Sequence, residues 1–265
     1  KSDENEKKSK LALKFSKIKE KRDELIKKDL ELLVRPKKPD KNKEKNRLLI
    51  IDLINEAHVQ EKEFNYSNVD KILKKALSLD FESEFKIEIL ILLSKNYIHL
   101  NELDYAIKTA QEALDYATQV NDSRKIELEF LIAKTNKNLY RLDKAKEQFE
   151  NIVVNDNNKD KHRALASLEL GELKEAQGQL KEAVECYKLS LSLSLSKNKE
   201  IVCRSYYKLA LLYDENQKLD KALEYYQKNY LTSSYKKENK YYSISLTNSA
   251  SILIEQKNYK KATEC

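Results

Sequence analysis

Residues that interrupt helices are almost missing from this chain, whose 265 residues include two glycines and two prolines. Sheets and their turns consume Gly, Pro and Asn, so this scarcity argues against a sheet-rich fold and predicts a chain that is nearly all helix. Long apolar runs are missing as well, because no stretch approaches the roughly 18 uninterrupted apolar residues of a membrane span. No signal peptide is visible in the sequence.

Cysteine and methionine are equally scarce. The three cysteines, Cys186, Cys203 and Cys265, are odd in number and have no C-x-x-C spacing, which disfavours a disulfide framework and favours a reducing compartment. We therefore expect a cytoplasmic location, while membrane tethering and a periplasmic location stay open. The chain has no methionine and starts at a lysine, so we expect it to be a fragment.

Groups that catalyse reactions or bind metals are also lacking. The three histidines, His58, His99 and His162, lie far apart and form no His-x-x-x-His pair, so a zinc site has no support. Gly171 and Gly178 are not followed by the Gly-Lys-Ser/Thr sequence of a phosphate-binding loop. No Ser, Cys or Lys has a neighbouring base at a spacing that supports nucleophilic catalysis. We expect a protein that is not an enzyme and has no cofactor or metal.

Positive charge is concentrated near the start of the chain. Residues 1–46 hold 17 Lys+Arg and 10 Asp+Glu, a net charge of +7, whereas the remaining residues hold 34 of each kind. A basic segment can contact nucleic acid or an acidic membrane surface. The interspersed acids and the neutral remainder disfavour nucleic acid, and contact with a membrane surface stays open.

Residues 1–34 are predicted to form a charged tail followed by an amphipathic helix. Apolar residues recur every seven positions at Leu11, Ile18, Leu25 and Leu32, as on one face of a helix. Both prolines fall in residues 35–46, and because Pro ends helices we expect a Pro/Lys-rich linker there. The predicted domain boundary lies in this linker.

Residues 47–265 repeat one pattern about six times. Each unit has a small residue, its first anchor, in one predicted helix and a second anchor twelve positions later in the next helix. The first anchors are Ala57, Ser94, Ala133, Gly171, Ala210 and Ala250. The second anchors are Val69, Ala106, Ala145, Ala183, Ala222 and Ala262. Small anchors let two helices cross closely, and a period of 37–40 residues indicates a solenoid of helix pairs.

Large residues accompany the anchors at constant offsets. Nine positions after the first anchor, next to the predicted turn, stand Tyr66, Leu103, Leu142, Leu180, Leu219 and Tyr259. Four positions after the second anchor stand Leu73, Phe149, Tyr187 and Tyr226, with the smaller Ala110 in the second unit. Both sets are predicted to fill the space beside the crossing helices. The Leu-Ser alternation of residues 189–196 suggests a strand, but its place at the end of a second helix favours helix.

The fourth and fifth units carry the motif of a known family. Leu170-Gly171, then Gly178-Gln179-Leu180-Lys181-Glu182-Ala183 and Tyr187, closely resemble the tetratricopeptide repeat. Leu209-Ala210, then Gln217-Lys218-Leu219-Asp220-Lys221-Ala222 and Tyr226, resemble it too. The resemblance covers roughly residues 47–265 and implies an all-α, right-handed superhelical solenoid of antiparallel helix pairs. We expect the N-terminal amphipathic helix to precede this solenoid.

Two features depart from the usual repeat. Its length is 34 residues in the family, with a proline that closes the second helix, whereas the units here are longer and lack that proline. In this they look like the repeats of kinesin light chains, Pins-type adaptors and Rap-type regulators. The sixth unit also stops at Cys265, without the polar capping helix that normally ends a solenoid. We expect an incomplete last repeat and a native chain that continues.

The resemblance also places a binding groove, because first helices line the concave surface in this family. The predicted groove residues are Lys95, Lys134, Lys137 and Phe130 on a basic side, and Glu172, Glu175, Asp214 and Tyr207 on an acidic side. Clustered lysines would attract an acidic peptide. The alternative is an ordinary solvated helix surface. A carboxylate clamp of the chaperone-binding kind is disfavoured, because Glu169 stands where that clamp needs an asparagine.

The leading hypothesis for function is a protein-interaction scaffold that binds a peptide or helix of another protein in this groove. The alternative is a sensory or regulatory segment of a larger signalling protein whose output domain lies beyond residue 265. Nucleic-acid binding through residues 1–46 is a third hypothesis, weakened by the acids of that segment. The sequence predicts no oligomeric state.

Overall fold

The computed structural model describes residues 21, 41–79, 83–155, 160–194, 198–233 and 240–264. The chain divides into two compact units, Lys1–Leu49 and Ile50–Cys265. The predicted amphipathic helix lies outside the described residues except for Lys21, which is helical. The predicted linker also lies outside them up to residue 40. Residues 41–46 are helical, and nothing in the sequence opposes this because both prolines come earlier.

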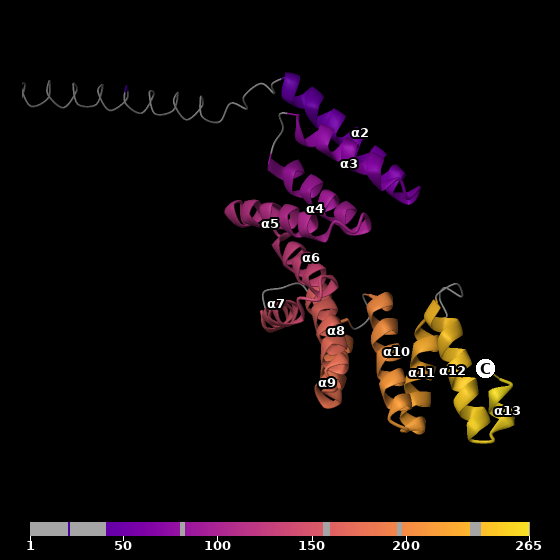
Figure 1. The fold of residues 1–265 in the computed structure, drawn as a ribbon. Helices are drawn as coiled ribbons and strands as arrows, with labels where there is room; N and C mark the ends of the chain where they lie inside the picture. Colours follow the sequence, from indigo (N-terminus) through magenta and orange to yellow (C-terminus); the bar gives the residue numbers. More distant parts are fainter. Residues whose placement is uncertain are drawn as a thin grey trace, which may run out of the picture. The chain divides into compact units, whose positions relative to one another are not determined.

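The described elements are all helices, in line with the predicted all-α fold (Figure 1). The helices of the first three units are α2 (Lys41–Lys62), α3 (Tyr66–Leu77), α4 (Ser83–His99), α5 (Leu103–Gln119), α6 (Lys125–Asn138) and α7 (Leu142–Val154). Those of the last three are α8 (Asp160–Ala176), α9 (Leu180–Ser194), α10 (Lys199–Glu215), α11 (Leu219–Ser233), α12 (Lys240–Glu255) and α13 (Tyr259–Ala262). None of these helices is long and apolar enough to cross a membrane.

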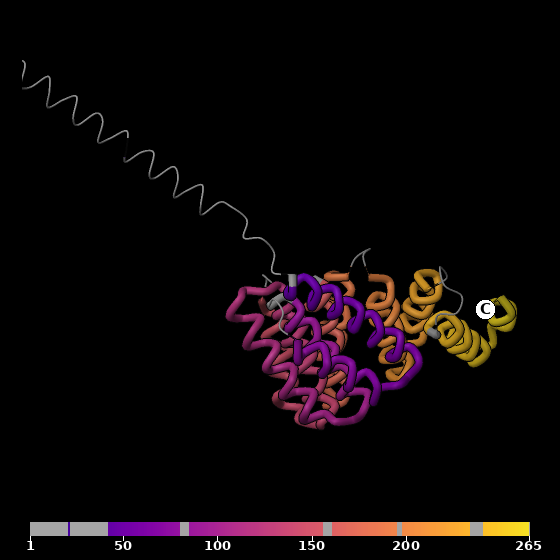
Figure 2. Tube along the Cα trace, turned by 90° about the horizontal axis from the view of Figure 1, so that it is seen from above, coloured from indigo at the N-terminus to yellow at the C-terminus, as the bar shows by residue number. Residues whose placement is uncertain are grey.

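Within Ile50–Cys265, consecutive helices pack against one another from α3 to α13, and Figure 2 shows them following each other in chain order. Direct contacts also join the first helices α6 to α8, α8 to α10, and α10 to α12. All six second helices begin at the large residue predicted next to the turn, from Tyr66 in α3 to Tyr259 in α13. The predicted helical solenoid is therefore confirmed. The Leu-Ser segment is helical as far as Ser194.

The anchors are the places where the paired helices approach most closely. In the first five units every anchor is buried. Gly171 is the tightest case, since a Cβ added there would lie 2.5 Å from Cε1 of Tyr187 on α9. The residues four positions after the second anchors, among them Phe149, Tyr187 and Tyr226, are fully buried. The predicted core is thus confirmed at these positions, whereas the predicted core residues next to the turn are half-buried in four units and exposed at Leu180 and Tyr259.

The turn inside each pair uses the same backbone conformation six times. Seven positions after each first anchor, the chain has a left-handed residue: Phe64, Asn101, Tyr140, Gly178, Gln217 and Lys257, with φ between 56° and 74°. In the third unit the Tyr140 N–H donates to the carbonyl of Lys137, and the Arg141 N–H donates to that of Asn136, both at 3.0 Å. These two bonds form a Schellman motif, which satisfies carbonyls that the helix end leaves free. Glycine occupies this position in the fourth unit alone.

Small polar residues also connect neighbouring helices. The Ser167 hydroxyl on α8 donates to the carbonyl of Cys186 on α9 at 2.8 Å. Asn229 on α11 donates to the carbonyl of Cys203 on α10 at 2.8 Å, and both residues are fully buried. Buried polar groups are tolerated when they are hydrogen-bonded in this way.

Candidate functional site

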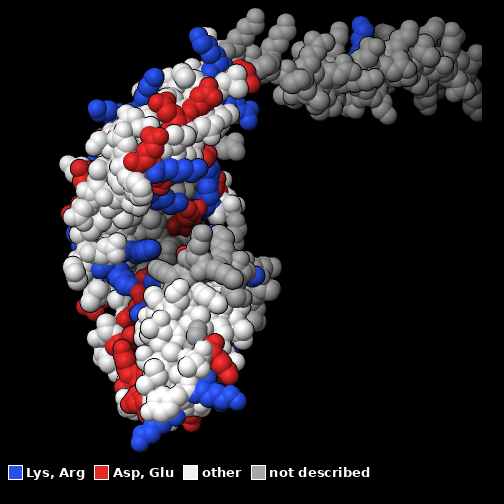
Figure 3. Space-filling view, turned by 90° about the vertical axis from the view of Figure 1, so that its right-hand side faces the viewer, with Lys and Arg blue, Asp and Glu red and all other residues white. Residues whose placement is uncertain are grey.

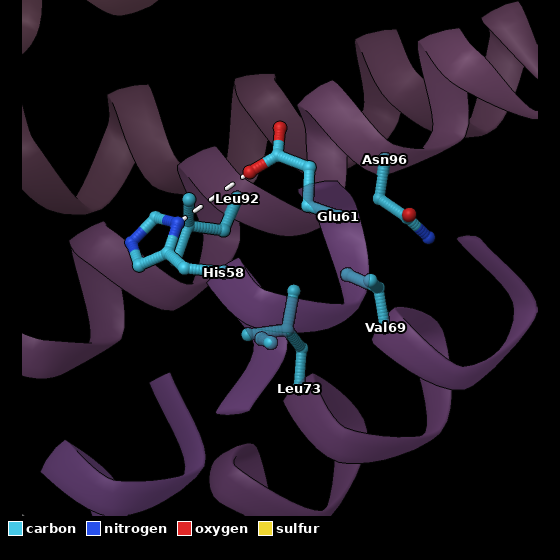
Figure 4. Close-up of a pocket in the computed structure, with 7 residues that line it drawn as sticks. His58, Glu61, Val69, Leu73, Leu92 and Asn96 are labelled. Atoms are coloured by element: carbon cyan, nitrogen blue, oxygen red, sulfur yellow. Dashed lines mark hydrogen bonds and ion pairs between the residues drawn. The ribbon is translucent and has the colours of Figure 1, made fainter. Parts of the chain in front are cut away.

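One enclosed hollow in the described array is very small. It lies between α2, α3 and α4 and has a volume of about 10 Å³. His58, Glu61 and Asn96 supply its polar groups and Val69 and Leu73 its apolar side (Figure 4). Such a volume holds about one water molecule, far from the ~300 Å³ or more of a small-molecule site. This hollow is therefore too small for a small-molecule ligand.

The most distinctive outer surface is a row of ion pairs across successive first helices, here called the first-helix face. It is made by α4, α6, α8 and α10. Lys137 on α6 contacts the carboxylates of both Glu169 and Glu172 on α8, at 2.6 and 2.7 Å. From the other side, Arg204 on α10 contacts the same two carboxylates at 3.1 and 2.8 Å. The two acids of α8 therefore lie between cations of the preceding and the following first helix.

One set of these pairs follows a fixed rule of position. The residue directly after a first anchor pairs with the residue six positions before the next first anchor. Lys95 and Glu127 form such a pair at 2.7 Å, and Glu172 and Arg204 form another at 2.8 Å with the charges reversed. In the third unit this rule would pair Lys134 with Leu165, which carries no charge. Lys134 is exposed, and no ion pair to it occurs within the part of the chain that the structure describes.

A second set follows another rule. The residue four positions after a first anchor pairs with the residue two positions before the next one. Lys137 and Glu169 follow this rule, as do Glu175 and Lys208 at 3.6 Å. In the fifth unit the rule would pair Asp214 with Asn248, which is neutral.

The ion pairs at the centre of this face are well shielded from water. The Glu169 side chain is 3% exposed and that of Lys137 is 21% exposed. Burial lowers the pKa of Lys137, but the charge of Glu169 and the hydrogen bonds to Glu169 and Glu172 outweigh it, so the pKa is raised. Burial likewise raises the pKa of Glu172, but the hydrogen bond from Lys137 and the charge of Arg204 outweigh it, so the pKa is lowered. Both groups are thus held in their charged forms at neutral pH.

The network continues inward to the helix pair. Glu175 accepts a hydrogen bond from the hydroxyl of Tyr187, the core residue that packs on Gly171. Burial, followed by the Glu175 contact, raises the pKa of Tyr187. Side-chain contacts therefore hold the first-helix face in place, both between successive units and within the fourth unit.

The structure places the eight predicted groove residues in three different situations. Four of them, Lys95, Lys137, Glu172 and Glu175, belong to the ion-pair network. Lys134 and Asp214 lie outside it. Phe130 and Tyr207 are half-buried rings that contact the core aromatics Phe149 and Tyr226, at 5.8 and 6.4 Å between ring centroids. The basic and acidic sets are therefore in contact with each other, and Figure 3 shows charges of both signs interleaved on the side it presents.

The pairing itself is what inspection of the sequence missed. Glu127, Arg204 and Lys208 are not among the predicted groove residues. A recurring separation of 32 residues joins Lys95 to Glu127, Lys137 to Glu169, and Glu172 to Arg204. A search for opposite charges at that separation would have found the network. No group of three or more His, Cys, Asp or Glu residues in the described ranges could hold a metal ion.

Comparison with known proteins agrees with this architecture. Residues 162–230 match the family model described as tetratricopeptide repeat. These residues are tetratricopeptide repeats, and the helix pairs around them have the same fold. A comparison with curated proteins found no match.

Several solved structures have a similar fold. BtubC (BKLC) from P. vanneervenii is 14% identical with a TM-score of 0.59, over 73% of this chain and 87% of that one. A Rap protein, solved in complex with competence and sporulation factor, is 18% identical with a TM-score of 0.61, over 82% of this chain and 72% of that one. PilF of Pseudomonas aeruginosa is 16% identical with a TM-score of 0.60, over 83% and 89%.

Proposed function

We propose that this chain is a scaffold that binds a peptide or helix of another protein along its first-helix face. The observation that carries the proposal is the interlocked network itself. Lys137, Arg204 and their two acids hold three first helices together through partly buried ion pairs. A surface fixed in advance loses less conformational entropy when a ligand binds. Binding, rather than catalysis, is the use that such a surface supports.

A more specific form of this proposal is that the bound peptide or helix is acidic. Lys95 already forms an ion pair with Glu127 at 2.7 Å, and Lys137 forms one with Glu169 at 2.6 Å. Both are therefore poor candidates for binding an acidic ligand. Lys134 is the lysine of the predicted set that has no such partner among the described residues. We therefore assign contact with an acidic side chain of the partner to Lys134.

The test uses proteome capture by three forms of the full chain. The wild type is compared with Lys134→Glu and with Lys108→Glu, a matched charge reversal of an exposed lysine on α5, a second helix. Helicity of each form is checked by circular dichroism. A partner that Lys134→Glu loses and Lys108→Glu retains supports both the face and the acidic ligand. Equal loss of the partner with both variants would show that binding occurs elsewhere or depends only on net charge. Replacing Lys137 is unsuitable, because it would also break the contacts to Glu169 and Glu172.

A sensory segment of a larger signalling protein is the second candidate. It is favoured by the Rap protein, which was solved with competence and sporulation factor bound. A full reading frame that ends within about 40 residues, one repeat, of Cys265 would remove it. Contact of the basic residues 1–46 with an acidic membrane stays a separate prediction, to be tested by salt-sensitive sedimentation with anionic vesicles.

A further inference from the structure

An open groove lies between α11, α12 and α13, the three helices at the yellow end of Figure 1. Its volume is about 410 Å³, above the ~300 Å³ at which ligand sites begin. The lining residues are Leu223, Gln227, Tyr230, Ser249, Leu253, Lys261 and Glu264. Leu223 and Tyr230 on α11 are half-buried and Leu253 on α12 is buried, whereas Lys261 and Glu264 are exposed. The groove thus combines an apolar side with exposed polar residues.

The corresponding place in the preceding unit is filled by a helix. By repeat position, the counterparts of Leu223, Tyr230, Ser249 and Leu253 are Val184, Leu191, Leu209 and Tyr213. All four counterparts belong to, or pack against, the same core cluster as Tyr226, the fully buried large residue of α11. In that unit the second helix therefore supplies the large side chain that occupies the space. In the sixth unit the described residues supply no such side chain.

The groove also contains a buried hydroxyl without a partner. Ser249 is 3% exposed, and its Oγ atom forms no hydrogen bond among the described residues. The equivalent position holds Leu170 in the fourth unit and Leu209 in the fifth, so the packing of the array does not require a polar group there. A buried polar group without a hydrogen bond is unfavourable. An occupant that brings a polar group to Ser249 would remove this cost.

We propose that this groove binds an amphipathic helix of another protein, which inserts a large apolar or aromatic side chain between α11 and α12. The groove continues the interface through which each unit packs on the next, and there the array's own second helices show what fits. An amphipathic helix buries an apolar stripe and keeps its polar face in water, which matches the two kinds of residue that line the groove. The site is separate from Lys134 on α6, so it extends the proposed function to a second surface.

The probe for this site is taken from the chain itself. It is a capped, fluorescein-labelled peptide of residues 223–233, the part of α11 that follows its small anchor and contains Tyr226. Two further peptides carry Tyr226→Phe and Tyr226→Ala. Binding to the full chain is measured by fluorescence anisotropy, and helix formation by circular dichroism, because so short a helix is marginal in water on its own. We expect the tyrosine and phenylalanine peptides to gain helix on binding and to bind about tenfold tighter than the alanine peptide.

Variants of the chain locate the site. Leu223→Lys should weaken binding of the phenylalanine peptide about tenfold. The matched control is Leu231→Lys, at a leucine of α11 that is 60% exposed and is not among the lining residues, and it should leave binding unchanged. Tyr230→Ala is a second variant in case Leu223→Lys alters the fold, and it should also weaken binding.

Three results would overturn the inference. They are absence of binding by the phenylalanine peptide, equally tight binding of the alanine peptide, and unaltered binding to both Leu223→Lys and Tyr230→Ala. The Lys134→Glu chain should bind the peptides as the wild type does, which separates this groove from the first-helix face. The proposed function would therefore survive a negative result if capture of a partner remains sensitive to Lys134→Glu.

Discussion

Gly171 on α8 and Tyr187 on α9 are in direct contact, with Cε1 and Cδ1 of the ring 2.5 and 2.7 Å from where a Cβ on the glycine would stand. Atoms do not approach that closely, so any larger residue at position 171 must displace the ring. The ring is fully buried and its hydroxyl is bound to Glu175, which restricts its movement. The contact thus connects the helix crossing of the fourth unit to the ion pairs of the first-helix face.

We expect Gly171→Ala to destabilise the array despite the better helix propensity of alanine. Overpacking of a filled core costs about 1–3 kcal/mol, and the propensity gain of about 1 kcal/mol offsets only part of it. The free energy of unfolding in urea should therefore fall, by up to about 2 kcal/mol. Combining it with Tyr187→Leu, which removes the clashing ring edge, should show favourable coupling in a double-mutant cycle. Strict additivity of the two changes would contradict the steric account.

For the left-handed turn residues, we expect a substitution that stabilises the protein. Tyr140 has φ of 56° and is 87% exposed, so its side chain has little packing to lose. Glycine avoids the steric cost of about 1–2 kcal/mol that a Cβ meets in this conformation. It also makes the unfolded chain more flexible, which offsets part of this gain. We expect Tyr140→Gly to raise the free energy of unfolding by about 0.5–1 kcal/mol. Lys146→Gly, inside helix α7, should instead lower it by about 1 kcal/mol.

The ion pairs of the first-helix face should contribute more to stability than exposed ones. Glu169→Gln leaves the partly buried Lys137 and Arg204 with one acid to share instead of two. Removing one member of a buried pair costs about 3–5 kcal/mol, and the remaining Glu172 reduces this, so we expect a loss of about 1–3 kcal/mol. Glu224→Gln, in the exposed pair with Lys228, should cost about 0.5 kcal/mol or less. Equal losses in chemical denaturation would show that burial of the network adds nothing.

The same network predicts how stability depends on pH. Since the folded state lowers the pKa of Glu172, its contribution is present above the ordinary value of 4.5 and is lost as the pH falls below it. Since the folded state raises the pKa of Lys137, its contribution is present below the ordinary value of 10.5 and is lost as the pH rises beyond it. Urea midpoints should therefore fall at both ends of the pH range. In Glu172→Gln the acidic fall should be shallower than in the wild type.

Much of the array follows from local patterns in the sequence. Anchors such as Ala133 and Ala145 recur at a period that only stacked helix pairs explain, and large residues such as Tyr66 mark the start of each second helix. These features depend on helix geometry and on the need for small residues at close crossings, which are properties of a few neighbouring residues. The left-handed residue of each turn could not be predicted, because Phe64 or Tyr140 gives no signal of positive φ.

The tertiary structure decided which charged residues form ion pairs with one another. Viewed along the sequence, Lys137 and Glu172 belong to a basic group and an acidic group in different units, which suggested a groove with two charged ends. Stacking brings α6 and α8 together, so the two side chains meet at 2.7 Å and neutralise each other. The sequence alone thus determined the helical repeat and its core, because burial follows local periodicity. The fold determined which of the predicted groove charges form ion pairs among the described residues and which, such as Lys134, do not, because pairing depends on which residues of successive units come within reach.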